Sequence, residues 1–200
     1  ELAPITVTPN SEGFKSKKDG NKTIWEVPLD VEKYGADGTA ITYTAKETPI
    51  NGYDTIVTKD SDNNVVITNI EKVSIGLTKK WLGKNGSAET PKAGTTITVK
   101  LMSGSEVVDT KELSLANKAG LDDATWKVEF KAVPKYKQDG TPINYTVEEV
   151  NVAGYTTQNS GDVNSGFVIT NKNTKDPNEK ITISGVKRWI GKAADTVTIY

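Results

Sequence analysis

Apolar and polar residues alternate in short runs along this chain of 200 residues. The clearest runs are residues 96–100, 126–130, 143–147 and 167–170. Alternation with a period of two indicates strands that bury one face. Asp-Gly and Asn-Gly pairs between the runs favour β-turns, and no window carries apolar residues at helical spacing over three turns. The pattern therefore predicts an all-β protein with enough short strands for a β-sandwich.

The chain also matches itself at a distance of 102 residues. The pairs that share this offset are Tyr34 and Tyr136, Tyr43 and Tyr145, Glu47 and Glu149, Gly52 and Gly154, and Asn69 and Asn171. Separate motifs do not keep one register by chance, so the chain contains a tandem repeat.

A second match joins the middle of the chain to its C-terminal segment. Residues 75–84 resemble residues 183–192, and residues 96–100 resemble residues 196–200. The two matches divide the chain into four parts. We predict the later part of a repeat without its opening strands over 1–70, a complete repeat over 71–172, a linker over 173–179, and the opening strands of a further repeat over 180–200.

Each incomplete piece would leave a sheet unfinished. Val186, Trp189 and Ile199 would be exposed in an isolated opening hairpin, and residues 1–70 would keep an open edge. Three explanations are open: the chain is a fragment of a longer protein, the repeat is split or permuted so that 180–200 of one molecule completes 1–70 of another, or a loop is missing from the printed sequence. We favour completion between molecules, because the complete middle repeat would hold the two pieces of one molecule apart. Such head-to-tail pairing gives filaments or rings.

Composition narrows the possible functions. The chain has 25 Lys and Arg against 26 Asp and Glu, so its net charge of −1 offers no basic field for nucleic acid or anionic lipid. It contains no His and no Cys, which excludes disulfides, thiol or histidine nucleophile systems, and zinc or haem sites built on those ligands. No stretch approaches the roughly 18 apolar residues of a membrane span. We therefore expect no cofactor, no metal site, no nucleic-acid partner and no membrane partner.

The complete repeat carries four short motifs. They are Lys79-Lys80-Trp81, Tyr145-Thr146-Val147-Glu148-Glu149, Gly154-Tyr155 and Val168-Ile169-Thr170-Asn171. These motifs resemble those of the B-type repeat of Gram-positive collagen adhesins, the Cna B-type domain of surface adhesins and pilins. The resemblance covers nearly the whole chain and implies tandem Ig-like inverse β-sandwiches. It also implies an isopeptide bond between Lys79 and Asn171, promoted by Glu149.

For the split repeat, the resemblance implies a bond between Lys187 and Asn69, promoted by Glu47. The lysine is chosen by its spacing, because Lys79 and Lys187 each stand two residues before a tryptophan. Arg188 takes the place of Lys80 in the second copy, which leaves only one lysine there.

An amine attacks a carboxamide only as the neutral base, and lysine in water has a pKa of about 10.4. Burial in an apolar core lowers the pKa of an amine and raises that of a carboxyl group. Strand alternation puts Lys79, Glu149 and Asn171 on apolar faces, where each would be costly without a partner. We expect a protonated Glu149 to hydrogen-bond and polarise the Asn171 carbonyl and to relay protons while ammonia leaves. The simpler alternative is that Lys79 reaches solvent and Asn171 starts a turn.

These inferences favour a structural stalk or adhesin module outside a Gram-positive cell, at its wall or surface, with isopeptide bonds as the source of rigidity. Its partners would be neighbouring repeats and another copy of itself. The reaction would be a single turnover on the protein itself, not enzymatic turnover. The alternative is a module that binds a host matrix protein or glycan through Tyr53, Tyr155 and residues 60–64, with the crosslink incidental. All four tryptophans are expected in cores.

Overall fold

The computed structural model describes residues 5–175 and 179–198, except for the side chain of Leu121. This described part contains eleven strands and no helix, which confirms the prediction of an all-β protein. In chain order the strands are β1 (Lys15–Asp19), β2 (Lys22–Glu26), β3 (Tyr53–Lys59), β4 (Val65–Leu82), β5 (Thr96–Ser103), β6 (Glu106–Ser114), β7 (Ala119–Asp122), β8 (Thr125–Pro134), β9 (Tyr145–Glu149), β10 (Tyr155–Asp162) and β11 (Gly166–Asn173). A helix long and apolar enough to cross a membrane does not occur among the described residues.

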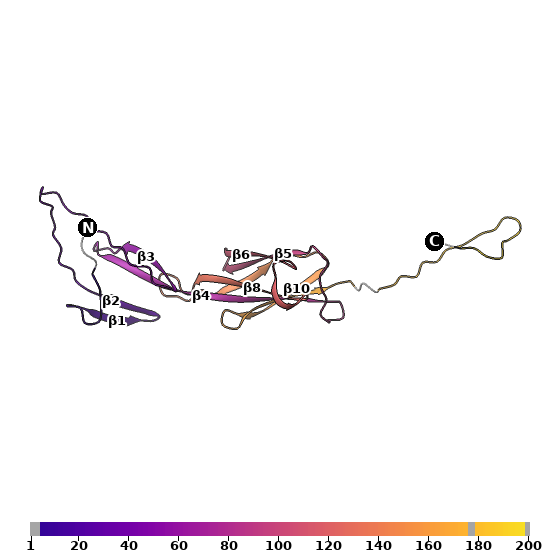
Figure 1. Ribbon diagram of the computed structural model, residues 1–200, viewed down its shortest axis with the longest axis horizontal. Helices are drawn as coiled ribbons and strands as arrows, with labels where there is room; N and C mark the ends of the chain where they lie inside the picture. The colour runs from indigo at the N-terminus through magenta and orange to yellow at the C-terminus, as the bar shows by residue number, and fades with distance from the viewer. Residues whose placement is uncertain (1–4, 176–178, 199–200) are drawn as a thin grey trace.

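The middle of the chain forms a two-layer β-sandwich (Figure 1). One sheet has the strand order β10-β11-β4-β8-β7, and the other has the order β6-β5-β9. Alternate residues of these strands face inward, as the sequence pattern predicts. The side chains between the sheets form one apolar cluster that includes Trp81, Leu101, Trp126 and Phe130. The Ig-like inverse β-sandwich implied by the resemblance is therefore the fold of this repeat.

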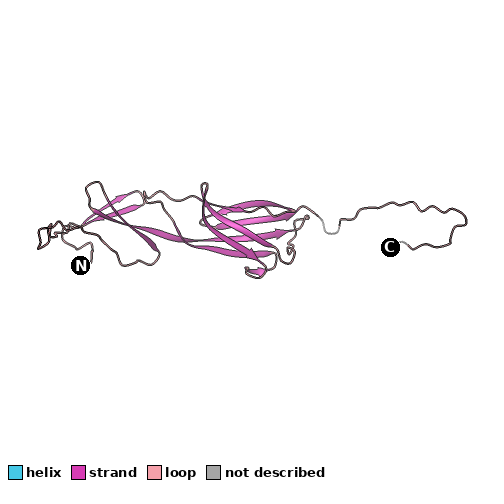
Figure 2. Cartoon of the chain, turned by 90° about the horizontal axis from the view of Figure 1, so that it is seen from above, coloured by secondary structure: helices cyan, strands magenta, loops and turns pink. Residues whose placement is uncertain are grey.

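Strand β4 is 18 residues long and serves both repeats. Its first half pairs antiparallel with β3, from Val65 to Glu71, and its second half lies between the parallel strand β11 and the antiparallel strand β8. The pairing with β3 ends at Glu71 and the pairing with β8 begins at Lys72, with a register shift between Val73 and Ile75. The last strand of the first repeat therefore continues without a loop into the first strand of the second, as Figure 2 shows from above.

Residues 5–70 hold only part of a sandwich. Strands β1 and β2 form a separate hairpin, and β3 pairs with β4. Residues 43–47, which correspond to β9, form no strand, because β9 pairs with β5 and residues 5–70 contain no counterpart of β5. Trp25 is 54% exposed, whereas its counterpart Trp126 is buried. The prediction that Trp25 lies in a core is wrong because the sheet that would cover it is incomplete.

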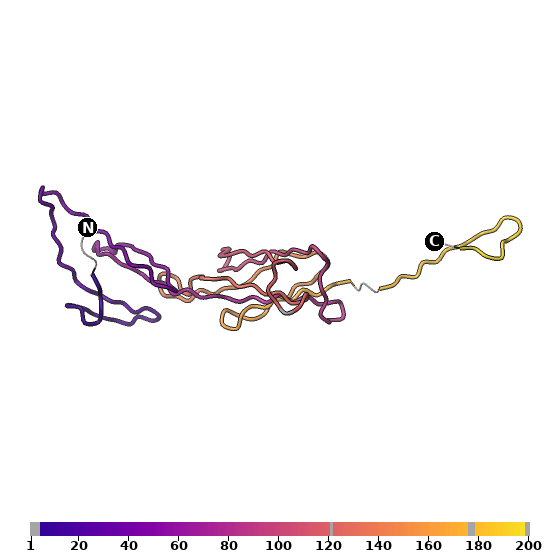
Figure 3. Tube along the Cα trace, viewed as in Figure 1, coloured from indigo at the N-terminus to yellow at the C-terminus, as the bar shows by residue number. Residues whose placement is uncertain are grey.

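The C-terminal segment forms no strand over its described residues, 179–198. Val186 is 84% exposed and Trp189 is 44% exposed, so the prediction that Trp189 lies in a core is also wrong. Ile199, part of the predicted opening hairpin, lies outside the described residues. The opening strands are not formed here because the described chain brings no sheet edge to this segment. Figure 3 shows it at the opposite end of the molecule from residues 5–70.

Candidate functional site

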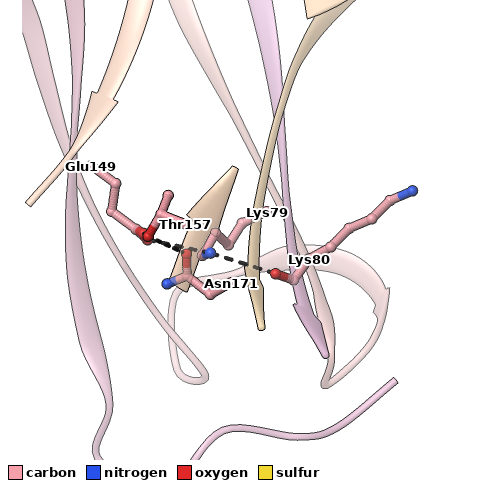
Figure 4. A network of polar contacts seen from close by, with 5 residues as sticks. All are labelled: Lys79, Lys80, Glu149, Thr157 and Asn171. Carbon is pink, nitrogen blue, oxygen red and sulfur yellow. Dashed lines mark hydrogen bonds and ion pairs between the residues drawn. The ribbon is translucent and has the colours of Figure 1, made fainter. Parts of the chain in front are cut away.

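Three strands bring the predicted site residues of the complete repeat to one place between the two sheets (Figure 4). Lys79 lies on β4 and Asn171 lies on β11, and these strands are parallel neighbours in one sheet. The register pairs Lys79 with Ile169 and Asn171 with Trp81, so the two side chains are diagonal neighbours on the inward face. Glu149 reaches them from β9 in the opposite sheet.

All three of these side chains are completely buried. The exposed fraction is 0% for Lys79, for Asn171 and for the side chain of Glu149. Lys80 is exposed, and its side chain points away from the site in Figure 4. The alternation of β4 therefore turns Lys79 inward, as its spacing to Trp81 predicted, and the alternative that Lys79 reaches solvent is wrong.

The Lys79 amine lies among groups that stabilise its charge only in part. Its Nζ lies 3.4 Å from Oε1 of Glu149, donates a 3.4 Å hydrogen bond to the carbonyl oxygen of Lys80, and lies 4.4 Å from the centre of the Trp81 ring. Burial lowers the pKa of Lys79 to about 8, although the Glu149 carboxylate acts to raise it. At pH 7 about one Lys79 amine in ten is then neutral, against roughly one in several thousand for an ordinary lysine.

Thr157 on β10 is the site residue that the sequence reasoning missed. Its hydroxyl Oγ1 lies 2.9 Å from Oδ1 of Asn171 and 3.3 Å from Oε2 of Glu149. Within the described chain no hydrogen bond joins Glu149 to Asn171, and Thr157 contacts the carbonyl oxygen of Asn171 instead. The predicted hydrogen bond from a protonated Glu149 stays a prediction. A sequence signal was present, because Thr55 and Thr157 share the offset of 102 residues.

Two polar atoms of the site are buried without a hydrogen-bond partner in the described structure, namely Nδ2 of Asn171 and Oε1 of Glu149, although Oε1 lies 3.4 Å from Nζ of Lys79 in an ion pair. Leaving Nδ2 unpaired costs about 1–3 kcal/mol. Nδ2 is the nitrogen that would depart as ammonia if the Lys79 amine attacked the amide. The site thus combines an amine of lowered pKa, a carboxyl group that can carry a proton, and an amide whose carbonyl oxygen accepts a hydrogen bond.

The corresponding residues of the N-terminal repeat are brought together only in part. Oγ1 of Thr55 lies 2.7 Å from Oδ1 of Asn69 and 3.3 Å from Oε2 of Glu47, the same arrangement as in the complete repeat. Asn69 and Glu47 are half-buried. Lys187 is exposed, and its Nζ lies 4.9 Å from the centre of the Trp189 ring. The structure of the single chain does not bring Lys187 to Asn69.

An open hollow of about 310 Å³ lies beside this partial site. Ala45, Val57 and Val65 line it. Two of these residues replace larger ones, since Ala45 corresponds to Val147 and Val65 corresponds to Phe167, and both larger residues are buried in the core of the complete repeat. The hollow therefore lies where the N-terminal repeat has smaller side chains than those that fill the core of the complete repeat.

Of the residues predicted to bind a host ligand, Tyr155 lies against the core, whereas Tyr53 and residues 60–64 lie at the surface. Tyr155 packs edge-on against Trp81, with ring centres 5.0 Å apart, so its ring belongs to the core. Tyr53 is 41% exposed, and residues 60–64 form a turn in which Oδ1 of Asp60 accepts hydrogen bonds from backbone N–H groups. No group of three or more Asp, Glu, His or Cys side chains that could hold a metal ion occurs in the part of the chain that the structure describes.

Comparison with known proteins was made by family, by sequence and by structure. The family model of the Cna protein B-type domain matches residues 5–70 and 75–172. The collagen adhesin of Staphylococcus aureus is 34% identical over 137 residues, which cover 67% of this chain and 11% of that protein. This chain therefore spans 11% of the length of that curated relative.

Two solved structures illustrate the range of similarity. Two B repeat units of the collagen binding protein of Staphylococcus aureus are 31% identical, with a TM-score of 0.40, covering 76% of this chain and 37% of that one. The pilus backbone protein RrgB of Streptococcus pneumoniae is 19% identical, with a TM-score of 0.38, covering 64% of this chain and 41% of that one.

Proposed function

The chain belongs to the Cna protein B-type domain family, and we propose that it is a structural stalk module of a Gram-positive surface adhesin or pilin, stabilised by an isopeptide bond between Lys79 and Asn171. The observation that carries the proposal is the complete burial of an amine, a carboxyl group and a carboxamide at one point between two sheets. Such groups are costly to bury without full pairing, and a reaction that joins the amine to the carboxamide would remove that cost. The module would act outside the cell, at its wall or surface, with neighbouring repeats as partners.

In the proposed mechanism, Glu149 carries the proton. Transfer of one proton from the Lys79 ammonium to the Glu149 carboxylate gives a neutral amine and a neutral carboxyl group, and burial favours this uncharged pair. The neutral Nζ of Lys79 then attacks Cγ of Asn171. The fold holds the two groups together, and such positioning can supply roughly 7–11 kcal/mol of the barrier.

In this mechanism Glu149 gives and takes up each proton that the reaction moves. As the Nζ–Cγ bond forms, Oδ1 of Asn171 takes up negative charge. Glu149 gives its proton to Nδ2, the Cγ–Nδ2 bond breaks, and the carboxylate then takes the surplus proton from Nζ. That last proton leaves with the ammonia as ammonium. Because each molecule reacts once and on itself, the protein is proposed to be no enzyme.

The bond would close a loop of 92 residues, from position 79 to position 171. By the chain-entropy relation used for disulfides, such a loop is worth about 4–5 kcal/mol against unfolding. The bond would also tie the first strand of the repeat to its last. A force that pulls the ends of the repeat apart would then pass through a covalent bond and would not peel the sheet. A chain without cysteine would gain this rigidity in any redox environment.

Intact-mass spectrometry of the purified chain tests the proposal. Each closed bond lowers the mass by about 17 Da, the mass of ammonia. Lys79→Met keeps the length of the side chain without its amine and is expected to have the full sequence mass. Lys80→Met is the matched control, because Lys80 is adjacent but exposed, and it is expected to lose ammonia as the unaltered chain does. A mass deficit that persists in Lys79→Met, or an unaltered chain at full mass, would contradict the assignment.

The split repeat is proposed to link molecules head-to-tail, with Lys187 of one copy bonded to Asn69 of the next. The partial site supports this, because Asn69, Glu47 and Thr55 already have the arrangement of the complete repeat and lack only a lysine. The sequence of 183–190 supports it as well. It repeats the second half of β4, which in the complete repeat lies between β8 and β11. The corresponding position in the N-terminal repeat is between β2 and the first half of β4.

A further inference from the structure

We infer that Thr157 is a catalytic residue of the bond-forming reaction, which holds the carbonyl oxygen of Asn171 and connects it to Glu149. The inference rests on the proposed function, because it concerns the bond between Lys79 and Asn171. Its basis is the position of one hydroxyl group between the two reacting partners of that site.

The strand register places Thr157 where it can act. Thr157 on β10 pairs directly with Asn171 on β11, and residues opposite each other in an antiparallel pair project from the same face. The Thr157 hydroxyl therefore meets Oδ1 of Asn171 at 2.9 Å, and Figure 4 shows the two side chains together with Glu149.

The Thr157 hydroxyl has contacts with both Asn171 and Glu149, but it has only one proton to donate. A threonine hydroxyl has one proton to donate and also accepts hydrogen bonds. Thr157 donates along its shorter contact, to Oδ1 of Asn171 at 2.9 Å. Its contact of 3.3 Å with Oε2 of Glu149 places the same hydroxyl beside the proposed proton carrier. Thr157 therefore connects the carbonyl oxygen of Asn171 to Glu149.

The N-terminal repeat has the same arrangement independently. Thr55 contacts Asn69 at 2.7 Å and Glu47 at 3.3 Å, although no lysine is present at that site in the single chain. The hydroxyl bridge therefore forms without help from the amine. A group that is already in place before the nucleophile arrives needs no rearrangement during the reaction.

The chemical role follows from where charge develops. Oδ1 of Asn171 becomes an oxyanion when the Lys79 amine adds to Cγ, and the Thr157 hydroxyl is aimed at that oxygen. Removing one such donor from an oxyanion site slows acyl transfer by about 10²–10³. A protonated Glu149 behind the hydroxyl strengthens its donation, because hydrogen bonds in a chain polarise one another.

The rate of ammonia loss tests the inference. The chain is recovered unfolded from inclusion bodies, refolded by dilution from guanidinium chloride, quenched in acid at intervals, and weighed by intact-mass spectrometry. Thr157→Val keeps the shape of the side chain without its hydroxyl, and we expect it to close about 100- to 1,000-fold more slowly than the unaltered chain. Thr157→Ser restores the hydroxyl and is expected to close at nearly the original rate.

Thr156→Val is the matched control. Thr156 is the neighbouring residue on the same strand, and its hydroxyl contacts only the carbonyl oxygen of Lys172, at 3.4 Å, among the described residues. This variant is expected to close at the original rate. Circular dichroism after refolding shows whether each variant has folded, and Thr157→Ala replaces the valine variant if that variant does not fold.

A stability measurement separates chemistry from packing. Urea denaturation in the Lys79→Met background, where no bond can form, is expected to show a folded majority with and without Thr157→Val. If the valine and alanine variants are both mostly unfolded under refolding conditions, the slow closure is assigned to folding and the inference is overturned. A folded variant that closes at the original rate would overturn it as well. An unaltered chain that never loses about 17 Da would instead contradict the proposed function itself.

Discussion

At the scale of single residues, the burial of Lys79 requires the most explanation. A charged amine in an apolar core carries a desolvation penalty of several kcal/mol, and its ion pair with Glu149 at 3.4 Å offsets only part of it. Nδ2 of Asn171 adds a second cost, because it has no hydrogen-bond partner in the described structure. Closing the bond would remove both costs together, since the amine becomes a neutral amide nitrogen and Nδ2 leaves. In the proposed function, closure would therefore be favoured by the removal of these two costs.

We predict that the rate of closure is constant around neutral pH and falls above about pH 8. In the proposed mechanism the proton that Glu149 carries comes from the Lys79 ammonium, and burial lowers the pKa of Lys79 to about 8. Above this pH Lys79 has lost that proton, so the proposed transfer cannot begin. The rate should then fall about tenfold for each pH unit. Refolding time courses followed by intact mass measure this profile. A rate that keeps rising toward about pH 10 would show that only the neutral amine limits the reaction.

At the scale of elements, the hairpin of β10 and β11 positions the site. Its turn is fixed by Asp162, whose Oδ1 accepts hydrogen bonds of 2.8 Å from the backbone N–H groups of Asn164 and Ser165. These hydrogen bonds lower the pKa of Asp162. Gly161 begins the turn with a φ of 85°, a conformation that costs a residue with a Cβ atom about 1–2 kcal/mol. The turn sets the register, and the register sets Thr157 opposite Asn171.

Gly161→Ala should therefore weaken the element that carries the site. A Cβ atom at position 161 would collide with the backbone oxygen of Gly166, and the left-handed φ adds strain. We expect the free energy of unfolding to fall by about 2–4 kcal/mol. Gly154→Ala is the control, because Gly154 has the same φ of 85° but no atom within 4 Å of the added Cβ, and about 1 kcal/mol is expected. Urea denaturation in the Lys79→Met background measures both, and equal losses would show that the collision has no effect.

The elements also explain which parts could be predicted from the sequence. Lys79, Glu149 and Asn171 lie on strands with strong apolar alternation, so their inward faces could be predicted before the structure was known. Thr157 lies on β10, whose residues after Tyr155 are Thr, Gln, Asn, Ser, Gly and Asp, so the strand has no apolar alternation that could indicate that the Thr157 hydroxyl turns toward the core. The prediction that Trp25 lies in a core was wrong for another reason. Trp25 does lie on a strand, but its burial depends on a covering sheet, and a strand pattern does not show whether that sheet is present.

At the scale of the whole molecule, the junctions between repeats differ. Ile75 follows Asn69 by six positions, but Ile183 follows Asn171 by twelve. The first junction is the uninterrupted strand β4, flanked by exposed ion pairs such as Lys135 with Glu71 at 3.0 Å. Exposed pairs of this kind contribute little, so the strand itself couples the first two repeats. The longer second junction separates the C-terminal segment from the sandwich (Figure 3).

We predict that concentrated protein forms covalent oligomers through its two ends. Lys187 of one molecule would react with Asn69 of another, so a denaturing gel should show a ladder whose higher bands weaken on dilution. Lys187→Ala is expected to abolish the ladder. Lys192→Ala, which removes another exposed lysine of the same segment, is expected to keep it. A single monomer band at high concentration would contradict the head-to-tail proposal.

The continuity of β4 has a consequence for proteolysis. Asn69 and Lys79 stand ten residues apart on this one strand, whereas the turns of the sandwich lie between Lys79 and Asn171. Once both crosslinks are closed, the shortest covalent path through the repeat runs along β4 and bypasses those turns. A protease that nicks any of them would leave two fragments still joined, and the array would survive damage that severs an ordinary polypeptide.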